Sequence, residues 1–179
     1  MSKPEEAGKK IIEALLKCKN KGVIADLKKG LVSGREFKAW PIISHHCNLE
    51  DDRMRIITQT IFGHFVSYPG GHKAGKNFGA SLGLLAIRRN KNDIKRGIKL
   101  YERHLNKLFG CPTSQDVCEA LGYLIRMMKG EGVHIDFESL YIDLCYWSER
   151  VRIRWAKGYL SYLTKPKEVE DVPDTDNGK

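Results

Sequence analysis

The chain has 179 residues, of which 41% are hydrophobic and 9% aromatic, a composition typical of a folded globular protein. With 31 Lys and Arg against 22 Asp and Glu it carries a formal net charge of +9, and this excess favours a polyanionic partner. No apolar run is long enough to span a bilayer, and none follows the charged N-terminus, so we expect neither a transmembrane helix nor a signal peptide.

The acidic residues are concentrated at the C-terminus. Residues 165–179 contain three Lys and five Asp or Glu, a net charge of −2, and the preceding 164 residues carry 28 basic and 17 acidic side chains, a net charge of +11. We expect nucleic acid rather than a membrane as the partner, because no predicted helix has the aromatic and basic pattern of an interfacial anchor. The tail lacks core residues, and we expect 165–179 to be disordered.

The five cysteines are odd in number and lie far apart in the sequence. They have no paired spacing and no secretory signal precedes them, which indicates reduced thiols and a cytoplasmic protein.

Helical periodicity accounts for the N-terminal half. Residues 2–22 begin with a capping-box spacing and end at Asn-Lys-Gly, and a short second helix covers about 23–30. Trp40-Pro41 interrupts the next segment, because proline disfavours helix in the residue before it. Asn48 and the acidic residues 50–52 open a long helix, which ends before the turn at 68–71.

A helix over about 77–88 follows that turn. Its Gly79 and Gly83 stand one turn apart and would allow a neighbouring helix to approach closely. The next helix, about 93–109, is basic on one side and apolar on the other. Its predicted apolar face consists of Ile94, Ile98, Tyr101, Leu105 and Leu108.

Thr113 caps a further helix that ends at Gly130, and Asp136 caps the aromatic-rich stretch 134–163. Apolar positions in that stretch recur as two helical stripes, so it predicts a pair of helices. We expect its tryptophans and tyrosines to form core and not to stack on bases.

No segment alternates with period two long enough to predict a sheet. The sequence therefore predicts an all-α protein, a compact helical bundle of about seven to nine helices with two small subdomains. The chain could divide at the loop 68–76 or at the polar patch 90–92. We place an N-terminal helical subdomain at 1–89, a C-terminal one at 90–164, and the acidic tail at 165–179.

Residues 70–77 (GGHKAGKN) nearly match a phosphate-binding loop, but they end in Asn where Mg²⁺ binding requires Ser or Thr. A predicted helix precedes them, whereas such a loop follows a strand. A flexible basic loop that touches phosphate and a plain solvent loop both remain open.

His45-His46-Cys47 contains metal-ligating residue types, but structural zinc requires a second cluster at short spacing, which the sequence lacks. The acidic residues at 50–52 serve the start of a helix, and Asp143 is explained by pairing with an arginine of the last helix. Cys118 and Cys145 fall beside core positions, as buried thiols do. We therefore predict no catalytic set, no metal site and no cofactor.

Basic side chains recur on several predicted helices with few acidic interruptions, although an ordinary solvated face mixes both signs. Such stripes could merge into a groove that follows a phosphate backbone. They comprise Lys28 and Lys29; Arg53 and Arg55; Arg96, Lys99, Arg103 and Lys107; Arg126 and Lys129; and Arg150, Arg154 and Lys157.

Several segments, in this order, resemble the CasB family, the small subunit of the type I-E CRISPR surveillance complex Cascade. They are ADLKKGL (25–31), FKAWP (37–41), NFGASLGLL (77–85), YERHLNKLF (101–109) and the block from ALGYLIRMMKGEG to RWAKGYL (120–160). The block is the most specific part, since a Gly turn, I-D-F, D-L-x-x-W and basic residues around W-A-x-x-Y keep a fixed order.

The resemblance implies an all-helical protein without enzymatic activity, present as two copies along the complex. Such a subunit lies against the backbone and large subunits, supports the CRISPR RNA–target heteroduplex and the displaced DNA strand, and thereby stabilises the R-loop. It implies no membrane and no small-molecule substrate.

Carried over by position, the resemblance implies two groups of nucleic-acid contacts. The first group is Lys29, Arg53, Arg103, Arg126 and Arg150; the neighbouring second group is Lys28, Lys107, Lys129, Arg152 and Arg154. Family members often have a second arginine where this chain has His104, which puts one phosphate contact in doubt because histidine is mostly neutral at pH 7.

Two other classes of protein compete with this interpretation. A free-standing helical DNA-binding regulator would need a helix-turn-helix with a recognition helix, and none is evident. A metal-dependent nuclease or phosphotransferase would need converging carboxylates or histidines.

Overall fold

The computed structural model describes residues 3–90 and 93–162, which form nine α-helices and one 3-10 helix, η1. This confirms the all-α class and the expected number of helices; the tail at 165–179 lies outside the described residues. Within them no strand forms, and His72 and Ile135 make an isolated bridge. The elements are α1 (Lys3–Lys17), α2 (Lys21–Lys29), η1 (Glu36–Lys38), α3 (Trp40–Ile43), α4 (Asp52–Ser67), α5 (Phe78–Arg89), α6 (Ile94–Phe109), α7 (Ser114–Gly130), α8 (Phe137–Cys145) and α9 (Glu149–Leu160).

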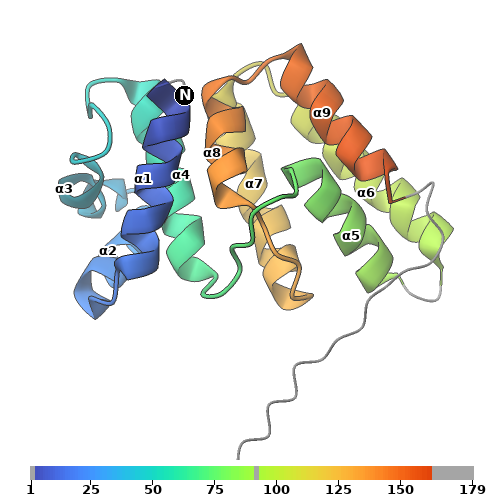
Figure 1. Cartoon of the computed structure of the whole chain (residues 1–179), viewed down its shortest axis with the longest axis horizontal. Coiled ribbons are helices and arrows are strands. Elements are labelled where there is room, and N and C mark those ends of the chain that lie inside the picture. The colour runs from blue at the N-terminus through green and yellow to red at the C-terminus, as the bar shows by residue number, and fades with distance from the viewer. Residues whose placement is uncertain (1–2, 91–92, 163–179) are drawn as a thin grey trace, which may run out of the picture.

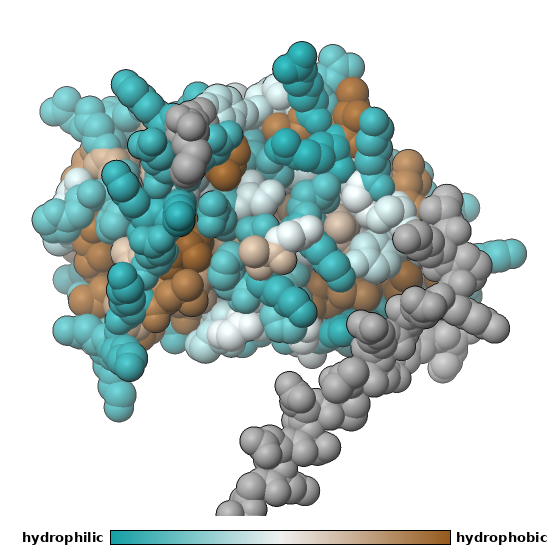
Figure 2. Space-filling model, in the orientation of Figure 1, coloured by the Kyte–Doolittle hydropathy of each residue, from teal (hydrophilic) through white to brown (hydrophobic). Residues whose placement is uncertain are grey.

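The helices are arranged in two layers (Figure 1). In this view α1, α8 and α9 lie in front of α4, α7 and α6, and α5 packs against α9, α6 and α7. Figure 2 shows that the front face mixes hydrophilic with hydrophobic residues.

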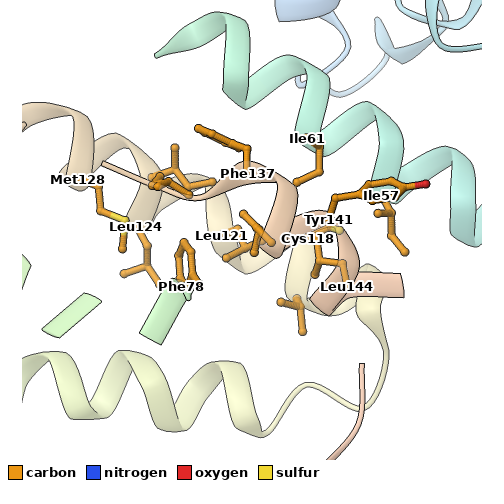
Figure 3. Close-up of a cluster of buried hydrophobic side chains, with 14 of the residues drawn as sticks. Ile57, Ile61, Phe78, Cys118, Leu121, Leu124, Met128, Phe137, Tyr141 and Leu144 are labelled. Atoms are coloured by element: carbon orange, nitrogen blue, oxygen red, sulfur yellow. The ribbon is translucent and has the colours of Figure 1, made fainter. Parts of the chain in front are cut away.

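One hydrophobic core fills the space between the layers (Figure 3). Side chains of α7 such as Leu121 and Met128 lie between Ile61 of α4 and Phe78 of α5. All of these side chains are at most 2% exposed, so α7 joins α4 to α5 through the centre of the core.

Side-chain caps fix where the helices begin. Thr113 and Asp116 form a complete capping box at α7, and Asp136 accepts a hydrogen bond from the Ser139 amide at α8, as predicted. The prediction for α4 was wrong by one turn. Asp51 caps it by accepting from the Met54 amide (3.0 Å), while Asn48 accepts from the Glu50 amide within the preceding turn.

The predicted close approach of helices at Gly79 and Gly83 is present between α5 and α9. A Cβ at Gly79 would lie 1.9 Å from the Trp155 carbonyl oxygen, and one at Gly83 would lie 3.0 Å from that of Tyr159. The two backbones are therefore in direct contact along one turn of α5. Only glycine permits this separation.

A buried carboxylate connects α8 to α9. Asp143 is 1% exposed, accepts a hydrogen bond from the Trp155 indole N–H (2.6 Å) and forms an ion pair with Arg154. This confirms the predicted pairing of Asp143 with an arginine of the last helix. Trp155 also packs on Phe78, with ring centroids 5.0 Å apart.

The face of α6 differs in part from its prediction. Tyr101, Leu105 and Leu108 are buried as expected, but Ile94 is 45% exposed and Gly97 is buried in its place. The reason is the close approach of α5, since a Cβ at Gly97 would lie 2.7 Å from the Ala86 carbonyl oxygen.

The subdomain boundary at 89/90 stays a prediction. In space α5 lies with α6 and α9, whereas α1, α2 and α4 lie with α7 and α8. The core continues across both groups of helices.

We predict that Gly79→Ala destabilises the protein, although alanine is more favourable than glycine in a helix by about 1 kcal/mol. The added methyl group meets the rigid backbone of α9, and overpacking of this kind costs about 1–3 kcal/mol. Urea unfolding should show a lower midpoint for this variant. Gly130→Ala is the matched control, because a Cβ there meets nothing within 4 Å; equal midpoints for the two variants would contradict the close contact.

Candidate nucleic-acid interface

The structure divides the ten predicted contact residues into two groups. Five are engaged in hydrogen bonds or ion pairs within the chain, and five have no such partner among residues 3–90 and 93–162. The engaged residues are Lys29, Arg53, Lys129, Arg152 and Arg154. The unengaged residues, all exposed, are Lys28, Arg103, Lys107, Arg126 and Arg150.

Arg53 is the most firmly engaged of the family-implied contacts. Its Nε donates to Ser114 Oγ (3.2 Å) and its Nη2 donates to the Cys145 carbonyl, so the side chain joins α4 to the start of α7 and the end of α8. Lys29 forms an ion pair with Asp26 at 2.7 Å on the surface of α2. These contacts occupy donors that phosphate would otherwise use.

Two arginines of α9 are also held within the fold. Arg152 stacks on Trp147 (5.3 Å from Cζ to the ring centroid) and donates to the Cys111 carbonyl oxygen (3.0 Å). Arg154 pairs with buried Asp143. Both side chains therefore help to hold α9 against the rest of the fold.

Lys129 is exposed and donates to the Ser67 carbonyl oxygen (2.7 Å) at the end of α4. A cation is favourable there, because the last carbonyl groups of a helix carry partial negative charge.

The end of α6 and the start of α9 lie at the same end of the bundle. Arg152 bonds to Cys111 just after α6, and the Tyr159 hydroxyl donates to the Ile98 carbonyl oxygen (2.5 Å), so α6 and α9 run antiparallel. The end of α6, with Lys107, therefore lies beside the start of α9, with Arg150. Arg103 lies one turn before Lys107 on the same face of α6.

A chain of rings connects α6 to α7. His104 packs on Tyr101 (5.6 Å between centroids) and on Tyr123 (5.7 Å), and Tyr123 lies one turn before Arg126. Burial, and next Lys107, lower the pKa of His104 below its ordinary value. His104 is therefore a neutral ring that supports Tyr123, and it supplies no cation at pH 7.

A groove of about 750 Å³ lies between α7, α4 and the segment 30–40. Trp40, His64, Tyr123 and Arg126 are among its lining residues. Burial, and next the charge of Arg126, lower the pKa of His64 to about 4. Sequence analysis missed Trp40, His64 and Tyr123, since they come from three distant segments; the only signal was the glycine at 122, which leaves the helix surface open.

The near-match to a phosphate-binding loop is tied to the segment before α8. The amide of Lys73 donates to the Ile135 carbonyl (3.1 Å), and that of Gly75 donates to Asp136 (2.8 Å). Asn77 caps α5 and donates to the Arg154 carbonyl. These bonds argue against the flexible basic loop, and α4 precedes the segment where a phosphate-binding loop would have a strand.

The candidate nucleophiles Cys118 and Cys145 are buried in the core, while His46 and Cys47 are partly buried and His45 is exposed. Burial raises the pKa of Cys118 to about 12 and that of Cys145 to about 11, so neither thiol is ionised at neutral pH. His46 packs on Phe62, and the Cys47 thiol faces the Ile43 carbonyl. Within the described residues no three His, Cys, Asp or Glu side chains gather as a metal site would require.

None of the described helices has the length and apolar character needed to cross a membrane.

The fold matches that of a solved protein. The crystal structure of M. ruber CasB resembles this chain with a TM-score of 0.68, over 88% of this chain and 94% of that one, at 17% sequence identity. The family model described as CRISPR-associated protein Cse2 matches residues 23–160. No curated protein matches the chain.

The described residues thus form an all-helical protein with the fold of CasB. The chain belongs to the CRISPR-associated Cse2 family, which confirms the resemblance to the CasB family found in the sequence.

We predict that His64→Gln makes the protein less sensitive to acid. The neutral imidazole is buried in the folded state, with a pKa of about 4, while unfolding restores its ordinary value of 6.5. The unfolded state therefore binds the extra proton, and His64 stabilises the fold fully above pH 6.5 and loses that contribution as the pH falls towards 4.

Between about pH 7.5 and about pH 5 the wild-type protein should lose about 2 kcal/mol more stability than His64→Gln. Urea unfolding at both pH values measures this difference. Parallel losses in the two proteins would show that His64 does not titrate as its burial requires.

Proposed function

We propose that this protein is the small subunit of a CRISPR RNA-guided Cascade complex that binds nucleic acid without sequence preference. The observation that carries the proposal is the group of five exposed cations without partners in the described chain, placed on α2, α6, α7 and the start of α9. Free cations lose little on binding phosphate, because they break no bond within the fold. Family membership supports the complex in which they would act.

The proposed role is to stabilise the R-loop, in which target DNA pairs with the CRISPR RNA and the other strand is displaced. The RNA–DNA heteroduplex is about as stable as the DNA duplex that it replaces. A few contacts between protein and phosphate are therefore enough to favour the R-loop. Such contacts require cations at suitable spacing and no base-reading helix. The proposed partners are the RNA, both DNA strands, the backbone and large subunits, and a second copy of this chain.

The protein is proposed to act without catalysis. The buried thiols of Cys118 and Cys145 are protonated at neutral pH, and the buried carboxylate of Asp143 pairs with Arg154. We place the protein in the cytoplasm, in keeping with five free cysteines.

The proposal is tested by charge reversal at Arg126 and Arg150. In a reconstituted complex that contains Arg126→Glu/Arg150→Glu, target DNA should dissociate from the R-loop at least about tenfold faster, because two attractive contacts become repulsive. The matched control is Lys9→Glu/Lys19→Glu, which removes the same charge from exposed positions in α1 and just after it. Dissociation rates that are equal in the two variants would refute the assignment.

A further inference from the structure

The groove between α4 and α7 is lined by a largely buried histidine that makes no hydrogen bond with the described residues. His64 is 7% exposed, lines the groove and has no hydrogen-bond partner among the described residues. A Cβ at Gly122 would lie 3.6 Å from its Nε2 and 3.5 Å from its Cε1, in ordinary contact. Glycine at 122 therefore leaves the imidazole uncovered on the side of α7. The imidazole therefore presents a hydrogen-bonding edge to whatever fills the groove.

Two aromatic side chains stand exposed in the same groove. Tyr123 is 53% exposed and Trp40 is 37% exposed, values high for residues of this size. Both are held in place: Tyr123 packs on His104, and the Trp40 indole N–H donates to Gln59 Oε1 (3.2 Å). Arg55 stacks on the Trp40 ring, with Cζ 5.5 Å from the centroid. Exposed rings that are fixed by their neighbours are suited to stacking on a flat ligand.

The charges that line the groove favour an uncharged ligand group inside it over a carboxylate. Burial and Arg126 keep His64 neutral, so it offers one donor and one acceptor but no second cation. Glu36 and Glu119 also line the groove and would repel a carboxylate held inside it. Arg126 is exposed in the lining, where an anionic group outside the groove can reach it. The groove thus fits a ligand with a flat neutral part and an attached anion.

We propose that the groove binds a single unpaired nucleotide, with its base against Tyr123 and Trp40, its edge hydrogen-bonded to His64, and its phosphate on Arg126. The inference rests on the proposed function and specifies it further. It makes this groove a base-dependent site, whereas the cations of α6 and α9 contact phosphate alone. A side chain of another subunit is the competing occupant.

The test compares two labelled single strands of equal length and charge, a ten-nucleotide oligo(dT) and the same backbone without bases. Fluorescence anisotropy should show that the full-length protein binds oligo(dT) at least about fivefold more tightly than the abasic strand. Gly122→Leu, which fills the groove over His64, should abolish this preference and leave abasic binding within about twofold. Gly130→Leu places the same side chain in open space on the same helix and should keep the preference.

Tyr123→Ala provides a second variant that removes an exposed ring and leaves the core intact, and it should also abolish the preference. Equal binding of both strands by the wild-type protein, or a preference that survives in both groove variants, would overturn the nucleotide site and leave the proposed function standing. Binding of neither strand would overturn both. A groove variant that fails to join the other subunits while keeping the preference for bases would assign the groove to a protein side chain, and so overturn the proposal.

Discussion

The arrangement of the C-terminal helices depends on the buried carboxylate of Asp143. A charge that is 1% exposed is tolerated only when it is paired and hydrogen-bonded, and here Arg154 and the Trp155 indole provide both. The pair fixes α9 against α8, and Trp155 then packs on Phe78 and on Trp147. The backbone contact at Gly79 follows from the same placement, since the Trp155 carbonyl is the atom that α5 meets.

This interaction also decides which cations are available to a partner. Once α9 is fixed, Arg154 is committed to Asp143 and Arg152 to Trp147 and Cys111, whereas Arg150 at the start of the helix remains free. Two arginines of α9, Arg152 and Arg154, therefore bond within the fold, whereas Arg150 is exposed to solvent. A net charge of +9 says nothing about this division, which arises from the packing.

Local sequence rules predicted the longer helices, the caps at Thr113 and Asp136, and the glycine contact between α5 and α9. They missed α3, which begins at Trp40 with Pro41 in its first turn, where an interruption was expected. These depend on residues close together in the chain or on a single side-chain size. The cap of α4 was assigned to Asn48 because two cap-forming residues lie within one turn, and only the backbone shows that Asp51 begins the helix.

The candidate site was less predictable. The sequence identified the basic residues. Whether each one bonds within the fold depends on partners far along the chain, such as the Cys111 carbonyl for Arg152 and the Cys145 carbonyl for Arg53. The groove was invisible for the same reason. Trp40, His64 and Tyr123 are separated by more than twenty residues each and meet only after α4 and α7 have packed.

We propose that cations without partners in the fold bind phosphate, whereas engaged cations maintain the fold. Arg150→Gln and Arg154→Gln remove the same charge four residues apart on α9, and each can be measured for stability and for the salt dependence of single-strand binding.

Arg150→Gln should leave stability within about 0.5 kcal/mol and reduce the slope of log K against log salt by about 0.7. Arg154→Gln should keep the slope and lose about 1–3 kcal/mol, because Asp143 then stays buried without its cation. An unchanged slope in Arg150→Gln together with unchanged stability in Arg154→Gln would contradict the account.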